Sequence, residues 1–313
     1  MRFNKLDLNL LVALDAMLTE RSISRAAERL HLSQSAMSNA LARLRVHFGD
    51  PLLAQVGRKM ELTPRGETLQ EAVRDVLVRI DSTVSAQPRF DAAHSDREFK
   101  VLVSDYTLTL LMPHLLALAY RQSRSVRFQL LPQVDHPQRH LERGEADLLV
   151  IPKGYCSPDH PTDTLFEEEF LCVVWSGSRY ANTALTLDQY VNAGHVVMDP
   201  PRGADKPAFE SWFMQRYGIS RRVDVTSFSF AAAPQLVVGT DRIATVHARL
   251  ARHAQRFLPL ELLAPPVPVP AMEQAMQWHK YRTLDPGLVW LRGLMHEAVR
   301  RMDAEASGSP SSA

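Results

Sequence analysis

Two short helical patterns lie almost end to end near the start of the chain, within residues 22–48. Apolar side chains recur at helical spacing over residues 23–30 and again over residues 36–48. Ser24 is placed to cap the first helix and Ser33 the second. Only His31 and Leu32 separate the first helix from the Ser33 cap of the second, so the two helices must cross steeply. This spacing predicts a helix-turn-helix, with a preceding helix capped by Asp7 as its packing partner.

The opposite face of the second helix carries short polar side chains and no large apolar group. Glutamine and asparagine pair with adenine edges, arginine pairs with guanine, and serine bonds bases or phosphates. A merely solvent-exposed face on a helical pair would also explain this pattern. If the face reads DNA, its residues are Ser33, Gln34, Ser35, Ser38, Asn39 and Arg43.

Two short strands follow, over residues 52–56 and 60–62, with Gly57 at the turn between them. A hairpin placed directly after a helix-turn-helix is typical of a wing. Arg58 and Lys59 at its tip are placed to reach a phosphate or a minor groove, although a solvent-exposed basic hairpin is the alternative. Residues 1–62 hold nine Lys/Arg and six Asp/Glu, a difference of +3, against +1 for the whole chain. This domain is therefore the part suited to DNA.

A single long helical pattern spans residues 63–86 and begins with a Thr-Pro start signal. Its apolar residues step by four and three along one face, as in a coiled coil. A lone helix cannot bury such a stripe, so pairing with a second copy is expected, and packing against its own chain is the alternative. The stripe consists of Leu69, Val73, Val76 and Ile80.

From residue 99 onward, strand and helix patterns alternate, which predicts an α/β body. We expect one helix over 106–122, a strand over 166–175 that crosses to a second lobe, and further helices over 208–217 and 232–238. A proline-rich stretch near residues 265–270 marks the return crossing. The predicted organisation is residues 1–62, a linker over 63–87, and a body over 88–302. Its lobes are about 88–165 with 268–302, and about 166–267; residues 303–313 are Ser/Gly/Pro-rich and predicted to be disordered.

Composition narrows the class of protein. The chain of 313 residues is 45% hydrophobic, yet its apolar windows are short and interrupted by charge, so no transmembrane helix is expected. No signal peptide is apparent, which predicts a cytoplasmic protein. In that compartment Cys156 and Cys172 are not expected to form a structural disulfide, although a redox-sensing pair remains an alternative.

Several motifs together resemble the winged helix-turn-helix of LysR-type transcriptional regulators. They are Ala-Ala-Glu-Arg-Leu at 26–30, Leu-Ser-Gln-Ser-Ala-Met-Ser at 32–38, Phe-Gly-Asp-Pro-Leu-Leu at 48–53 and Leu-Thr-Pro-Arg-Gly at 62–66. The resemblance implies a dimer through the linker helix, with a tetramer on an interrupted inverted repeat in double-stranded DNA. It also implies a two-lobed effector domain similar to periplasmic binding proteins, with RNA polymerase as a partner.

Later segments resemble the nodulation-protein-D-like branch of the family, whose effectors are phenolic or otherwise aromatic. They include Ser-Asp-Tyr at 104–106, Leu-Phe-Glu-Glu at 165–168 and Gly-Thr-Asp-Arg-Ile-Ala-Thr-Val-His at 239–247. By this resemblance Phe228 and Phe230 would contact an aromatic ring. Arg249 or His195 would bind a phenolate or carboxylate. Glu169 departs from the branch, where an amide or imidazole is usual. The implied cleft residues are Ser104, Asp105, Tyr106, Glu169, His195, Phe228, Phe230 and Arg249.

Two other groups of polar residues give weaker evidence for a functional site. His136 and His140 are four residues apart but lack a third metal ligand, and the three glutamates at 167–169 lack an accompanying nucleophile or phosphate loop. No metal, cofactor or enzymatic activity is therefore expected. The rival classes are a solute-binding protein or enzyme built on the α/β body, and an effector-independent or redox-responsive regulator.

Overall fold

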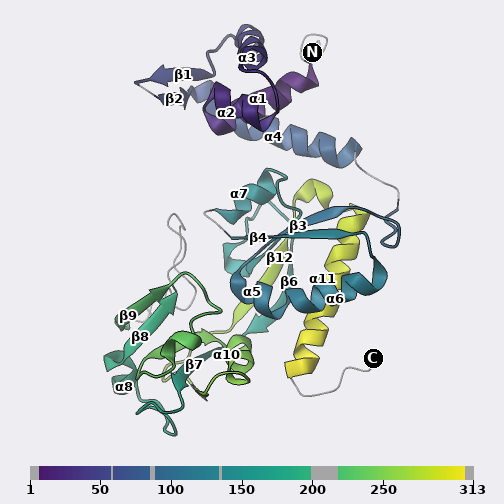
Figure 1. The fold of residues 1–313 in the computed structure, drawn as a ribbon. Helices are drawn as coiled ribbons and strands as arrows, with labels where there is room; N and C mark the ends of the chain where they lie inside the picture. Colours follow the sequence, from purple (N-terminus) through teal and green to yellow (C-terminus); the bar gives the residue numbers. More distant parts are fainter. Residues whose placement is uncertain (1–6, 58, 85–88, 134–135, 199–217, 307–313) are drawn as a thin grey trace. The chain divides into compact units, whose positions relative to one another are not determined.

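The computed structural model describes residues 7–57, 59–84, 89–133, 136–198 and 218–306. The chain divides into two compact units, residues 1–86 and 87–313 (Figure 1). The first is helical with a two-stranded hairpin, and the second holds two five-stranded sheets. This is the predicted architecture of a helix-turn-helix domain followed by an α/β body of two lobes. No helix among the described residues is long and apolar enough to span a membrane.

The helix-turn-helix packs on the first helix of the chain. Leu14, Met17 and Leu44 are completely buried at its centre. The second helix is capped by Ser22, whose Oγ accepts the Arg25 N–H at 3.3 Å, and not by Ser24 as the sequence suggested. The helix begins earlier because Ile23 already packs against the core. The three helices are α1 (Leu8–Glu20), α2 (Ile23–Arg29) and α3 (Gln34–Phe48).

The hairpin is formed by β1 (Leu53–Val56) and β2 (Lys59–Leu62), paired antiparallel as predicted. Helix α4 (Pro64–Val84) follows at once, and the Thr63 hydroxyl accepts the N–H of Gly66 at 3.0 Å. A Cβ at Gly66 would lie 2.5 Å from the Leu52 carbonyl oxygen, so only glycine lets α4 start this close to the hairpin. The hairpin and α4 are thereby held in one unit.

The apolar stripe of α4 packs against its own unit at one end and is exposed at the other. Leu69 and Val73 pack into the core of the chain's own first unit, and Val73 is only 5% exposed. Arg74 also ties α4 to α1 through an ion pair with Asp15 at 3.0 Å. Val76, one turn further along, is 45% exposed. The part of the stripe available to another chain therefore begins at Val76.

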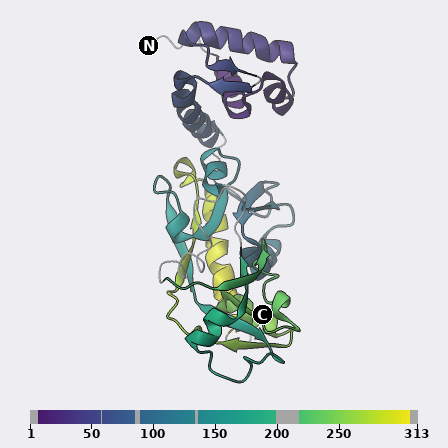
Figure 2. The same cartoon turned by 90° about the vertical axis from the view of Figure 1, so that its left-hand side faces the viewer.

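The first sheet of the second unit has the order β4-β3-β5-β12-β6. β3, β4 and β5 are parallel, and β12 runs antiparallel to both of its neighbours. Helices α6 and α11 pack beside each other against this sheet, as Figures 1 and 2 show. The elements of this first lobe are β3 (Glu98–Val103), α5 (Asp105–Leu110), α6 (Met112–Gln122), β4 (Arg127–Pro132), α7 (Pro137–Glu142), β5 (Leu148–Pro152), η2 (Lys153–Tyr155), β6 (Thr162–Glu168), β12 (Met272–Gln277), η4 (Lys280–Arg282) and α11 (Pro286–Ala306).

The second sheet has the order β11-β7-β10-β8-β9, with parallel pairs on either side of β8 and antiparallel pairs on either side of β7. Buried clusters lie on both of its faces. The chain thus passes from one lobe to the other twice, after β6 and before β12. The elements of the second lobe are β7 (Phe170–Trp175), α8 (Leu187–Asn192), β8 (Gly194–Met198), β9 (Arg222–Ser227), η3 (Gln235–Val237), β10 (Ile243–His247), α10 (Ala248–Gln255) and β11 (Leu260–Leu263).

Several element boundaries differ from the sequence prediction. The strand expected over 166–175 is two strands in two different sheets, with Glu169 between them. The helix expected over 106–122 breaks at Leu111, because Pro113 follows and cannot donate to the preceding turn. Residues 232–238 form turns and a single 3₁₀ turn around Pro234. The helix expected over 208–217 lies outside the described residues.

The last helix also extends further than expected. α11 continues past Met302 to Ala306, into the stretch predicted to be disordered. Met302 is buried, and Asp303 takes part in an ion pair with Arg249 at 2.9 Å. These two contacts hold the extra turn against the body.

The exposed half of the α4 stripe makes a testable prediction. Val76→Asp places a charge where we expect a second copy of α4, and an unpaired charge buried in such a contact costs several kcal/mol. Sedimentation should show the dimer of the variant dissociating at concentrations where the parent stays associated. Ser82→Asp adds the same charge on another face of α4 and should leave the oligomer unchanged. An unaltered oligomer in Val76→Asp would exclude this stripe from the interface.

Candidate DNA-reading surface and inter-lobe site

The polar face predicted on the second helix of the helix-turn-helix is the exposed face of α3. Met37, Leu41 and Leu44 point into the core, each at most 2% exposed. Two of the hydroxyls also have local roles, because Ser33 Oγ caps the helix by accepting the Ala36 N–H at 3.2 Å and lies 3.0 Å from Ser35 Oγ. Amide, guanidinium and hydroxyl groups are therefore displayed together along this surface. The exposed residues of the face are Ser33, Gln34, Ser35, Ser38, Asn39 and Arg43.

The hairpin is fixed to α3 by contacts that the sequence pattern did not reveal. Arg45 donates from Nε to the Pro51 carbonyl at 2.9 Å and from Nη2 to the Leu53 carbonyl at 3.0 Å. Asp50 accepts the Thr63 hydroxyl at 2.6 Å, and this bond holds the pKa of the Asp50 carboxyl below its usual range. These bonds orient the hairpin relative to α3.

At the tip of the hairpin, Lys59 is exposed, and Arg58 lies outside the described residues. Gly57 adopts φ +62°, the left-handed conformation that the tight turn requires. The tip of the hairpin thus presents the cationic Lys59 side chain to solvent.

The two lobes of the second unit meet at a buried carboxylate. Glu168, the last residue of β6, is completely buried. It accepts the Tyr106 hydroxyl of the first lobe, and from the second lobe it accepts the backbone N–H and Nη1 of Arg249, each at 3.0 Å. Arg249 is also paired with Asp303 of the first lobe at 2.9 Å. One arginine of the second lobe is therefore held by two carboxylates of the first.

The surrounding charges and burial fix the protonation of Arg249 and Tyr106. Burial lowers the pKa of Arg249, but the charges of Glu168 and Asp303 outweigh it and hold that pKa above its usual value. Burial, reinforced by the charge of Glu168, holds the pKa of Tyr106 well above its usual value. Tyr106 therefore remains a neutral donor to the carboxylate near neutral pH.

An aromatic cluster lies beside the carboxylate. The rings of Tyr106 and His247 stack with centroids 4.0 Å apart, and Phe230 meets His247 edge-on at 5.1 Å. Burial lowers the pKa of His247 to about 3, so its ring is neutral. The Nδ1 atom of His247 is buried and has no hydrogen-bond partner among the described residues. Gln274 Oε1 is in the same condition, while its Nε2 lies 3.4 Å from Thr107 Oγ1.

The start of α5 adds a second link between the lobes. Asp105 Oδ2 accepts the Ser229 hydroxyl at 2.6 Å and the Ala231 N–H at 3.0 Å. Ser104 caps α5 by accepting the Thr107 N–H at 3.2 Å. Four of the residues predicted to line the cleft are thus joined to this contact: Asp105, Tyr106, Phe230 and Arg249.

The remaining predicted cleft residues lie in different settings. His195 is completely buried in the second sheet, its Nε2 donates to the Tyr190 carbonyl at 2.6 Å, and burial lowers its pKa to about 4. Phe228 is 89% exposed on the loop after β9. Glu169 is exposed, and the inward-facing carboxylate is its neighbour Glu168. The prediction that Glu169 lines the cleft is therefore wrong by one residue, because it is Glu168 that faces inward.

Other singled-out residues have local partners. His140, on α7, pairs through Nδ1 with Glu145 at 2.8 Å. Cys156 and Cys172 are both free thiols, and Cys172 lies buried 3.7 Å from the Thr245 hydroxyl. Burial raises the pKa of Cys156, which opposes the formation of a reactive thiolate.

Together, a helix-turn-helix with a wing and a two-lobed α/β body are the parts of a DNA-binding transcriptional regulator. Residues 8–67 match the family described as bacterial regulatory helix-turn-helix protein, lysR family, and residues 92–300 match the LysR substrate binding domain. The chain belongs to the LysR family of transcriptional regulators and is not an enzyme.

The similarity to relatives and to solved structures extends over nearly the whole chain. The chain is 39% identical to nodulation protein D of Bradyrhizobium sp. (strain ANU 289), covering 99% of this chain and 91% of that protein. It is 40% identical to nodulation protein D 1 of Neorhizobium galegae, covering 99% of each. A probable transcriptional regulator from Pseudomonas aeruginosa shares 26% identity at a TM-score of 0.63, covering 94% of this chain and 97% of that one. CbnR in complex with its target DNA has the same fold, with 19% identity, a TM-score of 0.57 and coverage of 95% and 100%.

The neutral, buried His247 predicts how the free energy of unfolding depends on pH. His247 has a folded pKa of about 3, below the value of roughly 6.5 expected in the unfolded chain. The unfolded chain therefore binds the extra proton first, so stability is highest above pH 6.5 and is lost as pH falls toward 3. Going from pH 7.5 to 5.5 should cost about 1 kcal/mol for this residue. In urea unfolding at both pH values, His247→Phe should lose less stability than the parent. Equal losses would contradict the prediction.

Proposed function

We propose that this protein is a ligand-responsive regulator that binds an interrupted inverted repeat as a dimer, and that two dimers assemble on the DNA. Its promoter would be of a catabolic or symbiosis type, where it would contact RNA polymerase. The nodulation protein D relatives favour this class of promoter. The observation that carries the DNA-binding part is the exposed polar face of α3, backed by a buried apolar face and flanked by a braced wing.

The first test concerns base reading. Gln34→Ala and Arg43→Ala should each reduce discrimination between the DNA upstream of the protein's gene and a random-sequence duplex by about 1–3 kcal/mol, because each removes a bidentate base contact. Arg58→Ala should instead weaken binding to both duplexes and flatten the dependence on salt. Mobility-shift titrations give both quantities. Unchanged discrimination in both folded α3 variants would show that this face does not read bases.

The second part of the proposal is a small aromatic effector, phenolic in character, bound where the lobes meet. Buried polar atoms normally have partners, so the unsatisfied Nδ1 of His247 and Oε1 of Gln274 favour a site that a polar molecule completes. Phe230 and the Tyr106–His247 stack supply an apolar and aromatic wall for a ring. Phe228 and Ser104 would lie at the edge of this site. His195 would support the second lobe from its core.

Arg249 is the cation that an effector oxygen would meet, and its two carboxylate partners are not equivalent. Glu168 is completely buried, and stripping a partner from a buried charge costs about 3–5 kcal/mol. The Asp303 side chain is 46% exposed and can be rehydrated when it is displaced. A phenolate or carboxylate would therefore replace Asp303 and leave the Glu168 pair intact.

This inequality gives a test of the effector site. Asp303→Asn should strengthen the binding of substituted phenols or benzoates by several-fold in calorimetry, because Arg249 loses its competing carboxylate while Glu168 stays paired. Glu305→Gln removes an exposed carboxylate of the same helix, paired with Arg256 at 2.8 Å, and should leave affinity unchanged. No binding across the panel to the parent protein would refute an aromatic effector. Equal affinities in the parent and Asp303→Asn would place the ligand away from Arg249.

A further inference from the structure

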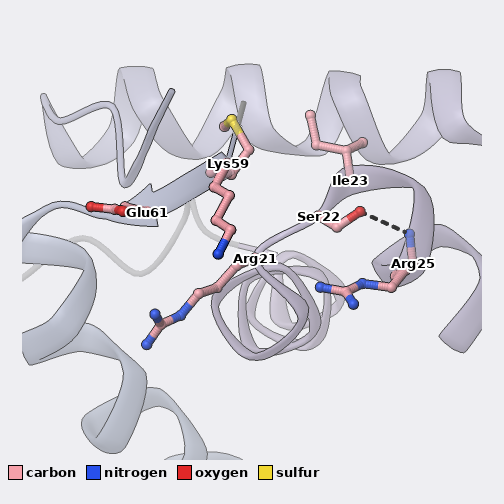
Figure 3. A pocket seen from close by; sticks show the side chains of 7 residues that line it. Arg21, Ser22, Ile23, Arg25, Lys59 and Glu61 are labelled. Atoms are coloured by element: carbon pink, nitrogen blue, oxygen red, sulfur yellow. Dashed lines mark hydrogen bonds between the residues drawn. The ribbon is translucent and has the colours of Figure 1, made fainter. Parts of the chain in front are cut away.

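An open hollow of about 690 Å³ lies in the first unit, between the start of α2 and the second strand of the hairpin. Figure 3 shows its side chains. Ile23 and Met60 belong to the edge of the domain core and give the hollow an apolar floor. Polar and charged groups complete the lining: Arg21, Ser22, Arg25, Lys59 and Glu61.

The charges of this hollow are mostly positive and only partly compensated. Arg25 donates to the Glu20 carbonyl at 2.5 Å and lies 3.8 Å from its carboxylate. Among the described residues, the side chains of Arg21 and Lys59 have no ion pair or hydrogen bond. Glu61 is the one acidic residue of the lining. The hollow therefore presents an excess of positive charge that the protein itself leaves unneutralised.

Arg21 is held in an unusual backbone conformation. It ends α1 at φ +48° and ψ +33°, in the left-handed region, where its N–H donates to the Met17 carbonyl. Glycine is the favoured residue at this place in a helix end, because a Cβ makes the conformation strained. Strain of this kind, held by the surrounding structure, is concentrated at functional sites. Arg21 occupies this position although glycine would be less strained there, and its side chain borders the hollow.

We propose that this hollow binds a phosphate of the DNA backbone, clasped by Arg21 from the α1–α2 turn and by Lys59 from the hairpin. The inference rests on the proposed DNA-binding function and adds a positioning contact to it. The turn before α2 and the hairpin belong to separate elements, so one phosphate held between them fixes the wing on the duplex. Such a contact positions the protein and carries no base information.

The experiment uses Arg21→Gly in the full chain. This variant removes the cation and relieves the backbone strain, so its melting temperature should be equal to or above that of the parent. Its affinity for both the upstream DNA and a random-sequence duplex should fall about fivefold for each chain bound, near physiological salt. The slope of log affinity against log salt should become shallower by about one for each chain bound. Arg21→Lys should restore most of the slope.

Two further variants sharpen the result. Glu61→Gln removes the opposing charge and should raise affinity for both duplexes, whereas Arg79→Gln removes a cation on α4 outside the lining and should leave affinity and slope unchanged. Unaltered affinity and slope in Arg21→Gly, with the parent binding normally, would overturn the phosphate site alone. A parent that binds neither duplex would overturn the proposed function itself.

A free anion is the other source of the same chemistry. Calorimetry with inorganic phosphate separates the two sources. Saturable binding of inorganic phosphate that Arg21→Gly abolishes, with DNA affinity unchanged, would mean that the hollow serves a free anion and would overturn the DNA contact. Weak or undetectable binding of inorganic phosphate together with the loss of DNA affinity supports it.

Discussion

The second unit depends on one buried carboxylate. Glu168 ends β6, an edge strand of the first sheet, and after Glu169 the chain enters the second sheet. Desolvation of an isolated carboxylate in such a place costs several kcal/mol. The Tyr106 hydroxyl and two donors of Arg249 offset that cost, and they come from different lobes. Neither lobe can move away without exposing the charge or leaving it unpaired.

The first unit uses a comparable device around its hairpin. Arg45 and Asp50 bond to backbone and hydroxyl groups at the start of β1 and just after β2, and Gly66 lets α4 approach the Leu52 carbonyl. Leu52 itself is completely buried with φ +61°, a conformation that costs about 1–3 kcal/mol and persists only when its surroundings fix it. Polar bonds and close packing therefore set the position of the wing, and strand pairing alone would leave it free to rotate.

The sequence predicted whatever depends on local spacing. The helix pair, the hairpin at Gly57 and the alternation of strands and helices follow from periodicity and turn residues within a few positions. The cleft glutamate was predicted as Glu169 but is Glu168, because a shift of one residue along a strand moves a side chain to the opposite face. Pro113 could have indicated the break in the helix, since proline cannot donate to the preceding turn. The apolar pattern continues across it, however, and favoured one uninterrupted helix.

Tertiary contacts decided what local patterns could not. The sequence shows that Arg249 is a polar residue in an α/β body, but its partners come from segments distant in the chain. Arg249 meets Glu168, 81 positions away, and Asp303, 54 positions away. Under the proposed function, a ligand at this site acts only through its different affinity for the joined and separated arrangements of the lobes. Because the Glu168 pair resists separation, an effector that preserves it would adjust the angle between the lobes and would not open them.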